Sequence, residues 1–440
     1  MTTTTLWHRP AAVPAAHRRN FFNLYLDIAW FGVLNASAIS FMAVYATRLG
    51  ATGWQIGLLN AGPALVSLVV TLPAGSWLQK RGSISRKVFW ASVGHRLFYV
   101  VWIFLPLFLL PQGQVTALIV LVFLMSIPGT ALSVGFNAVF AAAVPVEWRS
   151  YVTGIRNALL AVTFIAVSLL CGWLLEVLPF PLGYQVVFAI GTIGAATSSV
   201  HLWQVRPSNE STYVPRHGQS VGDLARPGTV RVWLGGMRTA VGDWRFLLNR
   251  RPAETGTQGK GVDPVFRWIL LAMFFFHLAQ YLPMALFPLY WVNHLGLSDQ
   301  DIGWGNAVFY GTVLLASMQL SRLSQRLSNR ALLVIGVLGM SVYPVLTAVT
   351  RDLTLFLIVS AVGGLTWGLV SGSQANYLLE RIPEDRRPAY LAWYNLALNA
   401  AVLLGSLSGP LMAAQIGLIT TLVVAGAARF AAALFVWRRS

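Results

Sequence analysis

Long hydrophobic runs alternate with short polar breaks along almost the whole chain. Breaking the sequence at Gly/Pro pairs and charged clusters leaves twelve candidate helices. Their lengths approach or exceed the roughly 20 residues that cross a hydrocarbon core about 30 Å thick. Backbone groups in a bilayer must be hydrogen-bonded within the chain, so the pattern predicts an all-α membrane protein with twelve transmembrane helices. The candidate spans are residues 21–47, 54–79, 87–110, 114–143, 151–178, 182–204, 265–292, 299–323, 330–350, 353–380, 388–414 and 417–437.

A repeated stretch divides these helices into two sets. Residues 49–61, LGATGWQIGLLNA, are written again as residues 295–307, LGLSDQDIGWGNA, at a constant offset of 246. Each copy lies where one apolar run ends and the next begins. Further matches follow in the same order, pairing Ser76, Leu78, Arg81 and Ser83 with Ser321, Leu323, Arg326 and Ser328, and Pro145, Arg149 and Asn157 with Pro383, Arg387 and Asn395. Two similar six-helix halves are therefore predicted, an arrangement of secondary transporters, whose binding site lies near the midplane between the halves.

The two halves are expected to be residues 1–204 and 265–440, joined by a cytoplasmic linker of residues 205–264. The linker is rich in basic residues, prolines and glycines, which makes it too polar to span and too long for an ordinary turn. Within it, residues 230–248 mix apolar and arginine side chains. That pattern is compatible with a helix lying in the headgroup layer and equally with a partly ordered basic loop.

The positions of the basic residues predict the orientation. With a cytoplasmic N-terminus, all but three of the 31 Lys and Arg residues fall in cytoplasmic loops or cytoplasmic thirds of helices. The exceptions are Arg48 and Arg351, which would lie outside, and Arg96, within the third span. The opposite orientation contradicts the positive-inside rule. We therefore expect a multi-pass protein of the cytoplasmic membrane with both termini cytoplasmic, and a retained first helix, since residues 1–20 lack a signal-peptide pattern.

Composition and missing motifs exclude several other classes of protein. The 440 residues are 56% hydrophobic and only 10% charged, which is too apolar for a soluble domain. The net charge of +17 could suggest a nucleic-acid partner, but the basic residues lie between helices and no motif that reads nucleic acid accompanies them. The single cysteine, Cys171, excludes an internal disulfide and a cysteine metal cage. No Walker loop, HExxH or GxSxG motif supports ATP-driven pumping or a familiar hydrolase.

The loop after the second span carries a family resemblance. Residues 75–82 read GSWLQKRG and are followed by Arg86 and Lys87. This is similar to the Gly-x-Leu-x-Asp-Arg-x-Gly-Arg-Lys signature of the major facilitator superfamily, and the chain resembles that family over essentially its whole length. The resemblance implies a hairpin that latches helix ends of the N-terminal half, with Gly75, Gln79, Arg81, Gly82 and Arg86 as candidates. Gln79 stands at the acidic position, so it can keep hydrogen bonds but not the ion pair.

Other motifs of the superfamily are missing. Its drug and proton antiporters usually carry an arginine in the fourth helix, but residues 115–143 contain none. Their fifth helix usually has a glycine-rich run that ends in Gly-Pro, whereas here only Cys171 and Gly172 occur at that place. A similar run, residues 405–410 (GSLSGP), lies in the eleventh span instead, where close helix packing is the favoured explanation. The antiporter subfamily is therefore not assigned.

Ionisable residues within the spans lead the list of candidate site residues, because such groups tend to face water or a partner. Asp27 in the first span has Arg156 in the fifth and Arg96 in the third at matching depth. The resemblance implies that the first, fourth, seventh and tenth helices line a cavity, that the second, fifth, eighth and eleventh flank it, and that the rest face lipid. On that basis Asp27 and Arg156 should meet, as a functional group or a static ion pair. His95 and Arg96 would have a structural role on a peripheral helix.

The remaining candidates are polar or aromatic. His277 and Gln280 share one face of the seventh span, and an imidazole at mid-depth can gain or lose a proton near physiological pH or form a hydrogen-bonded core. Trp367 lies among three glycines of the tenth span, which suit either a bending cavity helix or close helix contact. The other candidates are Asn35, Asn137, Gln374, Asn376 and Asn399. Such a lining favours hydrogen bonding and apolar contact over capture of a highly charged ligand.

Together these patterns predict a monomeric secondary active transporter that moves a small organic solute by alternating access, with drug or metabolite efflux as one direction. A transport-inactive membrane sensor of the same fold is an alternative, and a membrane-embedded enzyme is another. We expect no cofactor, metal or nucleic acid, with the lipid bilayer as the surroundings and protons or sodium as the coupling ion. Asp27 is the first candidate for proton coupling, and His277 is the second.

Overall fold

The computed structural model describes residues 15–80, 82–206, 264–382 and 387–439. These residues form helices joined by short turns and contain no strand, as predicted. We call the helices of residues 15–206 the first half: α1 (Ala15–Leu34), η1 (Asn35–Ile39), α2 (Ser40–Arg48), α3 (Gly53–Gln79), α4 (Ile84–Phe108), α5 (Pro111–Ala143), η2 (Val146–Trp148), α6 (Arg149–Val177) and α7 (Leu182–Gln204). The second half contains α11 (Pro264–Tyr281), α12 (Leu286–Leu289), η3 (Tyr290–His294), α13 (Asp299–Arg326), α14 (Asn329–Val349), α15 (Leu353–Arg381), α16 (Arg387–Ile416) and α17 (Leu418–Arg439).

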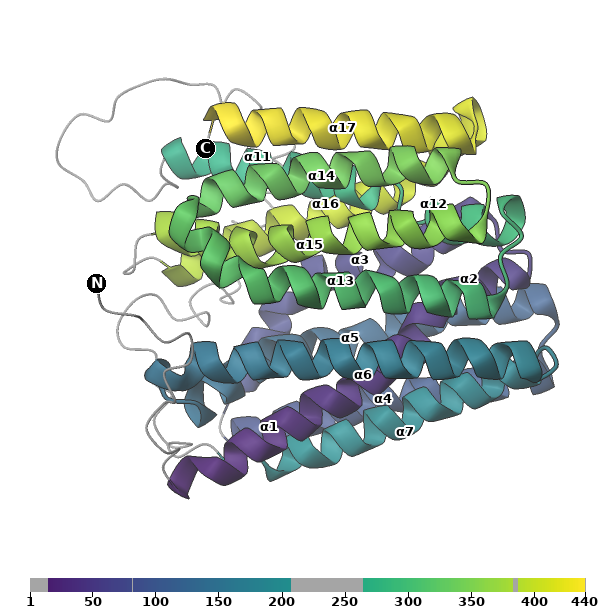
Figure 1. Cartoon of the computed structure of the whole chain (residues 1–440). Helices are drawn as coiled ribbons and strands as arrows, with labels where there is room; N and C mark the ends of the chain where they lie inside the picture. Colours follow the sequence, from purple (N-terminus) through teal and green to yellow (C-terminus); the bar gives the residue numbers. More distant parts are fainter. Residues whose placement is uncertain (1–14, 81, 207–263, 383–386, 440) are drawn as a thin grey trace.

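The long helices lie side by side and form one bundle (Figure 1). α1 begins and α17 ends at the same end of the bundle, on the left in Figure 1. We call this the proximal end and the opposite one the distal end. Most of the linker, including residues 230–248, lies outside the described residues.

Eleven helical stretches among the described residues are long and apolar enough to cross a membrane. The remaining predicted span is α13, which has 28 residues but several polar side chains along its length. One of them, Asn306, donates a hydrogen bond from Nδ2 to Ser40 Oγ of the first half (3.1 Å). α13 packs against α15 of its own half and α6 of the other. α13 can therefore be less hydrophobic than the other spans, because it packs between two other helices of the protein.

The repeated stretch encodes the distal turn between two helices. In both copies the glycine after the first helix has a positive φ, 84° at Gly50 and 65° at Gly296. Side chains other than glycine rarely adopt this conformation, which stops a helix. Thr52 and Ser298 then cap the next helix, each in a capping box with the residue three positions later. The repeat in the sequence is thus a repeat of helix-stop and helix-start chemistry.

The first and seventh spans are both interrupted. The first contains the π-helical segment η1, and the seventh breaks after Tyr281. Pro283 has no N–H group, so the carbonyl of Ala279, four residues earlier, loses its helical partner. The N–H of Met284 bonds to Tyr281 O (3.2 Å), which leaves the carbonyl of Gln280 without its helical partner as well.

Arg429 of α17 is fully buried and bonds to these two carbonyls. Its Nε donates to Ala279 O (3.3 Å) and its Nη2 to Gln280 O (2.9 Å), while Nη1 donates to Met340 O of α14 (2.9 Å). A cation at the C-terminal end of a helix is also favoured by the helix dipole. The sequence pattern counts Arg429 among the residues near the cytoplasmic face, but the structure places it inside the second half, where it holds the broken end of α11.

The hydrophobic clusters show how the halves meet. At the distal end one cluster contains side chains of both halves, for example Ile56 and Ile302 of the two repeated stretches. At the proximal end the clusters are separate, because the one around Phe21 contains only first-half residues and the one around Phe266 only second-half residues. The halves are therefore packed together distally and have independent cores proximally.

Two helix crossings, α3 with α16 and α6 with α13, make this distal contact. A Cβ on Gly57 would lie 2.6 Å from Ser406 O, and one on Gly303 would lie 2.8 Å from Ser168 O. Small residues allow helix backbones to approach this closely. Gly57 and Gly303 occupy the same place in the repeated stretch, so each half contributes one such glycine to the interface.

Candidate functional site

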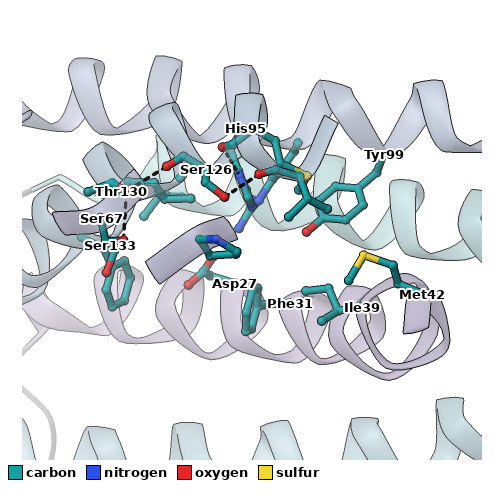
Figure 2. Close-up of a pocket in the computed structure, with 18 of the residues that line it drawn as sticks. Asp27, Phe31, Ile39, Met42, Ser67, His95, Tyr99, Ser126, Thr130 and Ser133 are labelled. Atoms are coloured by element: carbon teal, nitrogen blue, oxygen red, sulfur yellow. Dashed lines mark hydrogen bonds between the residues drawn. The ribbon is translucent and has the colours of Figure 1, made fainter. Parts of the chain in front are cut away.

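A cavity of about 580 Å³ lies within the first half, between the interrupted first span and α3, α4 and α5. Figure 2 shows Asp27, Phe31 and Met42 along one wall, with His95 and Tyr99 of α4 opposite. The lining contains the charged side chains of Asp27, Arg96 and Arg156 and a larger number of aromatic and apolar side chains. The lining combines a mostly apolar surface with a few polar groups, as is common in sites that bind small molecules.

Asp27 is buried in an ion pair with Arg156 of α6. Arg156 Nη1 donates to Asp27 Oδ2 at 3.3 Å and to Leu24 O at 2.6 Å. The other carboxylate oxygen, Oδ1, accepts a hydrogen bond from Ser198 Oγ of α7 at 2.6 Å. The guanidinium carbon of Arg156 also lies 4.8 Å from the ring centre of Phe136, within the range of a cation–π contact. The structure thus brings together the two residues whose matching depth suggested a pair.

Arg96 and His95 of α4 also line the cavity, although the expected role of this helix was peripheral. Arg96 Nη1 donates to Ala195 O (2.9 Å) and to Ser199 Oγ (2.7 Å) of α7. His95 Nδ1 lies 2.8 Å from Met125 O of α5. The ring occupies space left by Gly129, where a Cβ would come within 2.8 Å of it. The expected lipid-facing position of this helix differs from the structure, because the cavity extends between α4 and α5 inside the half. The structural role expected of the two side chains stays a prediction.

A row of hydroxyl groups follows one face of α5. Ser126, Thr130 and Ser133 all line the cavity and are spaced by four and three residues, the spacing of one helix face. Ser126 Oγ donates to Val122 O (2.6 Å) and Thr130 Oγ1 to Ser126 O (2.8 Å). Ser67 of α3 lies 3.3 Å from Thr130. Since the protons of Ser126 and Thr130 are used on the backbone, these hydroxyls offer acceptors to the cavity. Their spacing was the available signal, but these hydroxyl residues were not predicted as part of a site.

The other side chains of the lining are mostly aromatic and apolar. The rings of Tyr99 and Trp102 meet edge to face with centres 4.8 Å apart. Phe31, Met42 and Met125 add further apolar surface. Such side chains can pack against a ring or a hydrocarbon body.

A second polar cluster lies in the second half. His277 Nε2 is 2.9 Å from Gln374 Nε2 and 3.0 Å from the hydroxyl of Tyr394. An amide nitrogen can only donate, so His277 Nε2 accepts and the ring proton is assigned to Nδ1. Within the described chain, His277 Nδ1 and Gln280 Oε1 are buried without a hydrogen-bond partner. The cluster joins predicted residues of α11 and α15, and Tyr394 of α16 was missed.

The remaining predicted site residues are dispersed. Asn137 lines the cavity, whereas Asn35 lies half-buried in η1. Asn376 is exposed and Asn399 donates to Asn395 O of its own helix (2.8 Å). Trp367 packs against the proximal core of the second half. The three glycines around it, Gly363, Gly364 and Gly368, would each place a Cβ within 3 Å of Tyr343, Phe309 O or Ala316, so they serve close helix contact.

The predicted latch is described only in part. Arg81 and the side chain of Gln79 lie outside the described residues. Gly75 lies within α3, and Gly82 has φ +118°, a turn conformation that favours glycine. Arg86 is exposed, and its backbone N–H bonds to the capping side chain of Ser83 at 3.3 Å.

Lys87 closes the end of α3 instead. Its Nζ donates to Trp77 O and Leu78 O at 3.1 Å, and also to Lys80 O. These carbonyls belong to the last turn and the C-cap of α3, where a cation also complements the helix dipole. The hairpin is thus held by a lysine on backbone carbonyls, an arrangement that needs no acidic side chain at position 79.

The glycine-proline run of the eleventh span packs within the distal contact. A Cβ on Gly405 would lie 2.6 Å from Leu278 O, and one on Gly409 would lie 1.8 Å from Leu282 O, both next to the break in α11. Pro410 contacts the Gly57 region of α3. This position agrees with helix packing, the explanation favoured from the sequence.

The comparisons with known proteins agree with this architecture. The family model described as Major Facilitator Superfamily matches residues 28–298 and again residues 269–440. A search among curated proteins finds no matching sequence.

Solved transporter structures share the fold. The xylose transporter XylE from E. coli, in a partially occluded inward-open conformation, has a TM-score of 0.66 at 15% identity, covering 97% of this chain and 98% of that one. A POT family transporter in complex with a thioalcohol-conjugated peptide has a TM-score of 0.70 at 11% identity, with 95% of each chain covered. A mutant of the nucleoside transporter NupG has a TM-score of 0.62 at 14% identity, covering 95% of this chain and 98% of that one. At these identities the likeness concerns the fold.

Proposed function

Because the chain belongs to the major facilitator superfamily, we propose that it is a secondary active transporter that moves a small organic solute across the cytoplasmic membrane by proton-coupled alternating access. One observation carries the proposal. The halves share a hydrophobic cluster at the distal end and have separate clusters at the proximal end, and a cavity with a buried carboxylate lies within the first half. A carrier needs such one-sided closure, because its site must face one side of the membrane at a time.

Polar contacts between the halves close the distal end. Arg48 at the end of α2 pairs with Asp299 of α13 (3.0 Å) and also donates to Leu297 O (2.6 Å). The hydroxyl of Tyr184 donates to the other carboxylate oxygen of Asp299 at 2.7 Å. Arg48 is partly exposed, so this pair is a modest contribution that can break and re-form. We assign it the role of a distal gate, which must open when the cavity faces the other side.

The proximal end is proposed to be cytoplasmic. Arg48 and Arg351 lie at distal turns, and both termini and the basic loops are assigned to the other side by the positive-inside rule. Because the halves are packed together distally, the described conformation is then proposed to face the cytoplasm. A reporter fused after Gly256 should read cytoplasmic and one after Arg351 external; the reverse pattern would overturn the orientation.

Asp27 is proposed as the proton-coupling group. It is the buried carboxylate of the cavity and interacts with a cation that also touches the cavity. Adding a proton removes its charge and weakens the pair with Arg156, so the protonation state can change which contacts Arg156 makes. Among the structural neighbours, one is described as a D-xylose-proton symporter, which shows that the fold accommodates proton coupling in that protein.

The test is proton-driven solute flux in liposomes that contain the purified protein and a pH-sensitive dye. A panel of sugars, nucleosides, amino acids and aromatic acids should include a solute that accumulates against its gradient when a proton gradient is imposed. Asp27→Asn should abolish this accumulation while exchange of the same solute continues, because only the protonation step is lost. Glu147→Gln, an exposed carboxylate change near the proximal end, is the matched control.

Two results would contradict the proposal. An absence of flux for every solute under proton or sodium gradients would argue for a sensor. Full proton-driven accumulation by both Asp27→Asn and His277→Gln would instead remove proton coupling and favour a uniport or sodium-linked carrier.

A further inference from the structure

We propose that the cavity of the first half binds an organic monoanion, with its anionic group between Arg96 and Arg156 and its apolar body against the aromatic side chains of the cavity. This inference rests on the proposed transport function and names the class of solute. It goes beyond the sequence-based expectation of a lining without strong net charge, because the structure adds Arg96 to the cavity.

The charges that face the cavity do not balance. The lining contains two arginines, Arg96 and Arg156, and one carboxylate, Asp27. The lining also includes His95 and Tyr99, which add no negative charge when neutral. One positive charge is therefore left without an acidic partner among the described lining residues. An unpaired charge in a buried site is costly, so an anion that enters the cavity gains a partner that the protein itself does not supply.

The two arginines also have unused hydrogen-bond donors. Arg96 and Arg156 each bond through Nη1 only, and their Nε and Nη2 atoms have no hydrogen-bond partner in the described part of the chain. Arg96 Nε is fully buried and so out of reach of a ligand, whereas Arg96 Nη2 and the two free nitrogens of Arg156 are not among the fully buried atoms. Arg429 provides the contrast, because it uses all three nitrogens on backbone carbonyls. Arg156 therefore has two adjacent free donors, which match the two oxygens of a carboxylate, and Arg96 adds its Nη2.

The same contacts disfavour a cation or an unspecific neutral solute. Each oxygen of Asp27 already accepts one hydrogen bond, from Ser198 or from Arg156, and Arg156 balances its charge, so the carboxylate has less to offer an amine than an unpaired one would. An amine would also meet the surplus positive charge of the two arginines. A neutral solute could use the hydroxyl row but would leave the free guanidinium donors unpartnered.

The rest of the cavity indicates the body of the solute. Its volume of about 580 Å³ falls within the usual range for small-molecule sites. Tyr99, Trp102 and Phe31 form an aromatic surface suited to a ring, and the hydroxyls of Ser126 and Thr130 can accept from a donor on that ring. An aromatic or similarly apolar monocarboxylate combines these properties.

This arrangement links the solute to the proton. Asp27 and the solute anion compete for Arg156, so protonation of Asp27 releases the guanidinium for the solute. The proton and the anion then bind together, and the loaded cavity has the same net charge as the empty one. The direction of coupling that follows is symport.

Matched compounds of different charge test the proposal on the purified wild-type protein. We would measure thermal stabilisation and dissociation constants for phenylacetate, phenylacetamide and phenethylamine, and for indole-3-acetate, indole-3-acetamide and tryptamine. At least one carboxylate should bind about tenfold more tightly than its amide and its amine. Binding of neither carboxylate, or equal binding of the amides, would overturn the proposal.

Variants assign the binding to the two arginines. Arg96→Gln and Arg156→Gln should each weaken carboxylate binding about tenfold, whereas the exposed Arg351→Gln should leave it unchanged. Asp27→Asn should increase the affinity for the carboxylate about threefold or more, because the carboxylate that competes for Arg156 is gone. Damage to the fold would not be expected to increase the affinity. Wild-type affinity in both arginine variants would contradict the assigned site. Flux of an amide or amine would refute only the solute class, whereas carboxylate binding without any flux would refute transport and leave the anion site standing.

Discussion

Buried arginines show how one residue type takes different roles in this bundle. Arg156 was identifiable from its sequence depth, which matches that of Asp27, and the two do pair. Arg96 was assigned to a peripheral helix, because the position of a helix in the family arrangement does not say which face of it a residue occupies. Arg429 donates to two backbone carbonyls that lack helical partners because α11 breaks near Pro283. The two segments are far apart in sequence, so the depth of Arg429 along its own helix does not reveal this contact.

The hydroxyl contacts of the site were equally hidden. Ser126 and Thr130 bond to their own helix, as such residues commonly do in membrane helices, and Ser198 holds Asp27 from a distant span. Neither role changes the hydropathy pattern. The sequence therefore suggested the ion pair but not the groups around it.

Replacing Arg429 should destabilise the second half without touching the cavity of the first. Arg429→Gln removes up to three donors and leaves the carbonyls of Ala279 and Gln280 buried without partners. Such a loss costs on the order of 3 kcal/mol, so the apparent melting temperature in detergent should fall by several degrees. Arg438→Gln, on the exposed last turn of the same helix, is the control and should melt like wild type. An unchanged melting temperature for Arg429→Gln would show that the α11 break does not depend on this residue.

At the scale of the helices, the starts and stops were predictable to within a few residues because local chemistry determines them. Ser83 and Ser328, matched in the sequence, both cap helices at the proximal end, and Thr52 and Ser298 do so distally. The interruptions were not predicted, although Pro283 was an available signal for the one in the seventh span. A hydropathy criterion does not identify α13 as a membrane span, because this helix packs between other helices and is more polar than the rest.

The α6–α13 crossing depends on glycine, and Cys171 provides a natural reporter for it. Cys171 is the single cysteine, is fully buried in the distal cluster and precedes Gly172, whose Cβ would lie 3.2 Å from the Cα of Gly303. Gly303→Leu should separate the two helices and increase the rate of maleimide labelling of Cys171 by about tenfold or more, as local opening becomes easier. Gly311→Leu on the same helix meets only Ile165 Cδ1 at 3.9 Å and should label like wild type. Equal labelling in both variants would argue against a glycine-dependent distal contact.

At the scale of the whole molecule, the repeated stretch and the spans predicted the fold, and the family model and the solved transporters agree with it. The relative placement of the halves could not be predicted in the same way. Two access states of a carrier share nearly all their contacts within each half and differ by only a few kcal/mol, so local patterns do not select one. The structure contributes the distal closure, including the interface role of Gly57 and Gly303.

Reversible closure of the distal gate tests alternating access most directly. In a Cys171→Ala background, Arg48→Cys and Asp299→Cys replace the ion pair with two thiols, which a short bifunctional methanethiosulfonate can join across the former contact. Transport into liposomes, measured with the solute identified in the flux panel, should stop on crosslinking and return on reduction. Each single-cysteine variant treated in the same way should remain active. Unchanged transport after complete crosslinking would contradict alternating access about this gate.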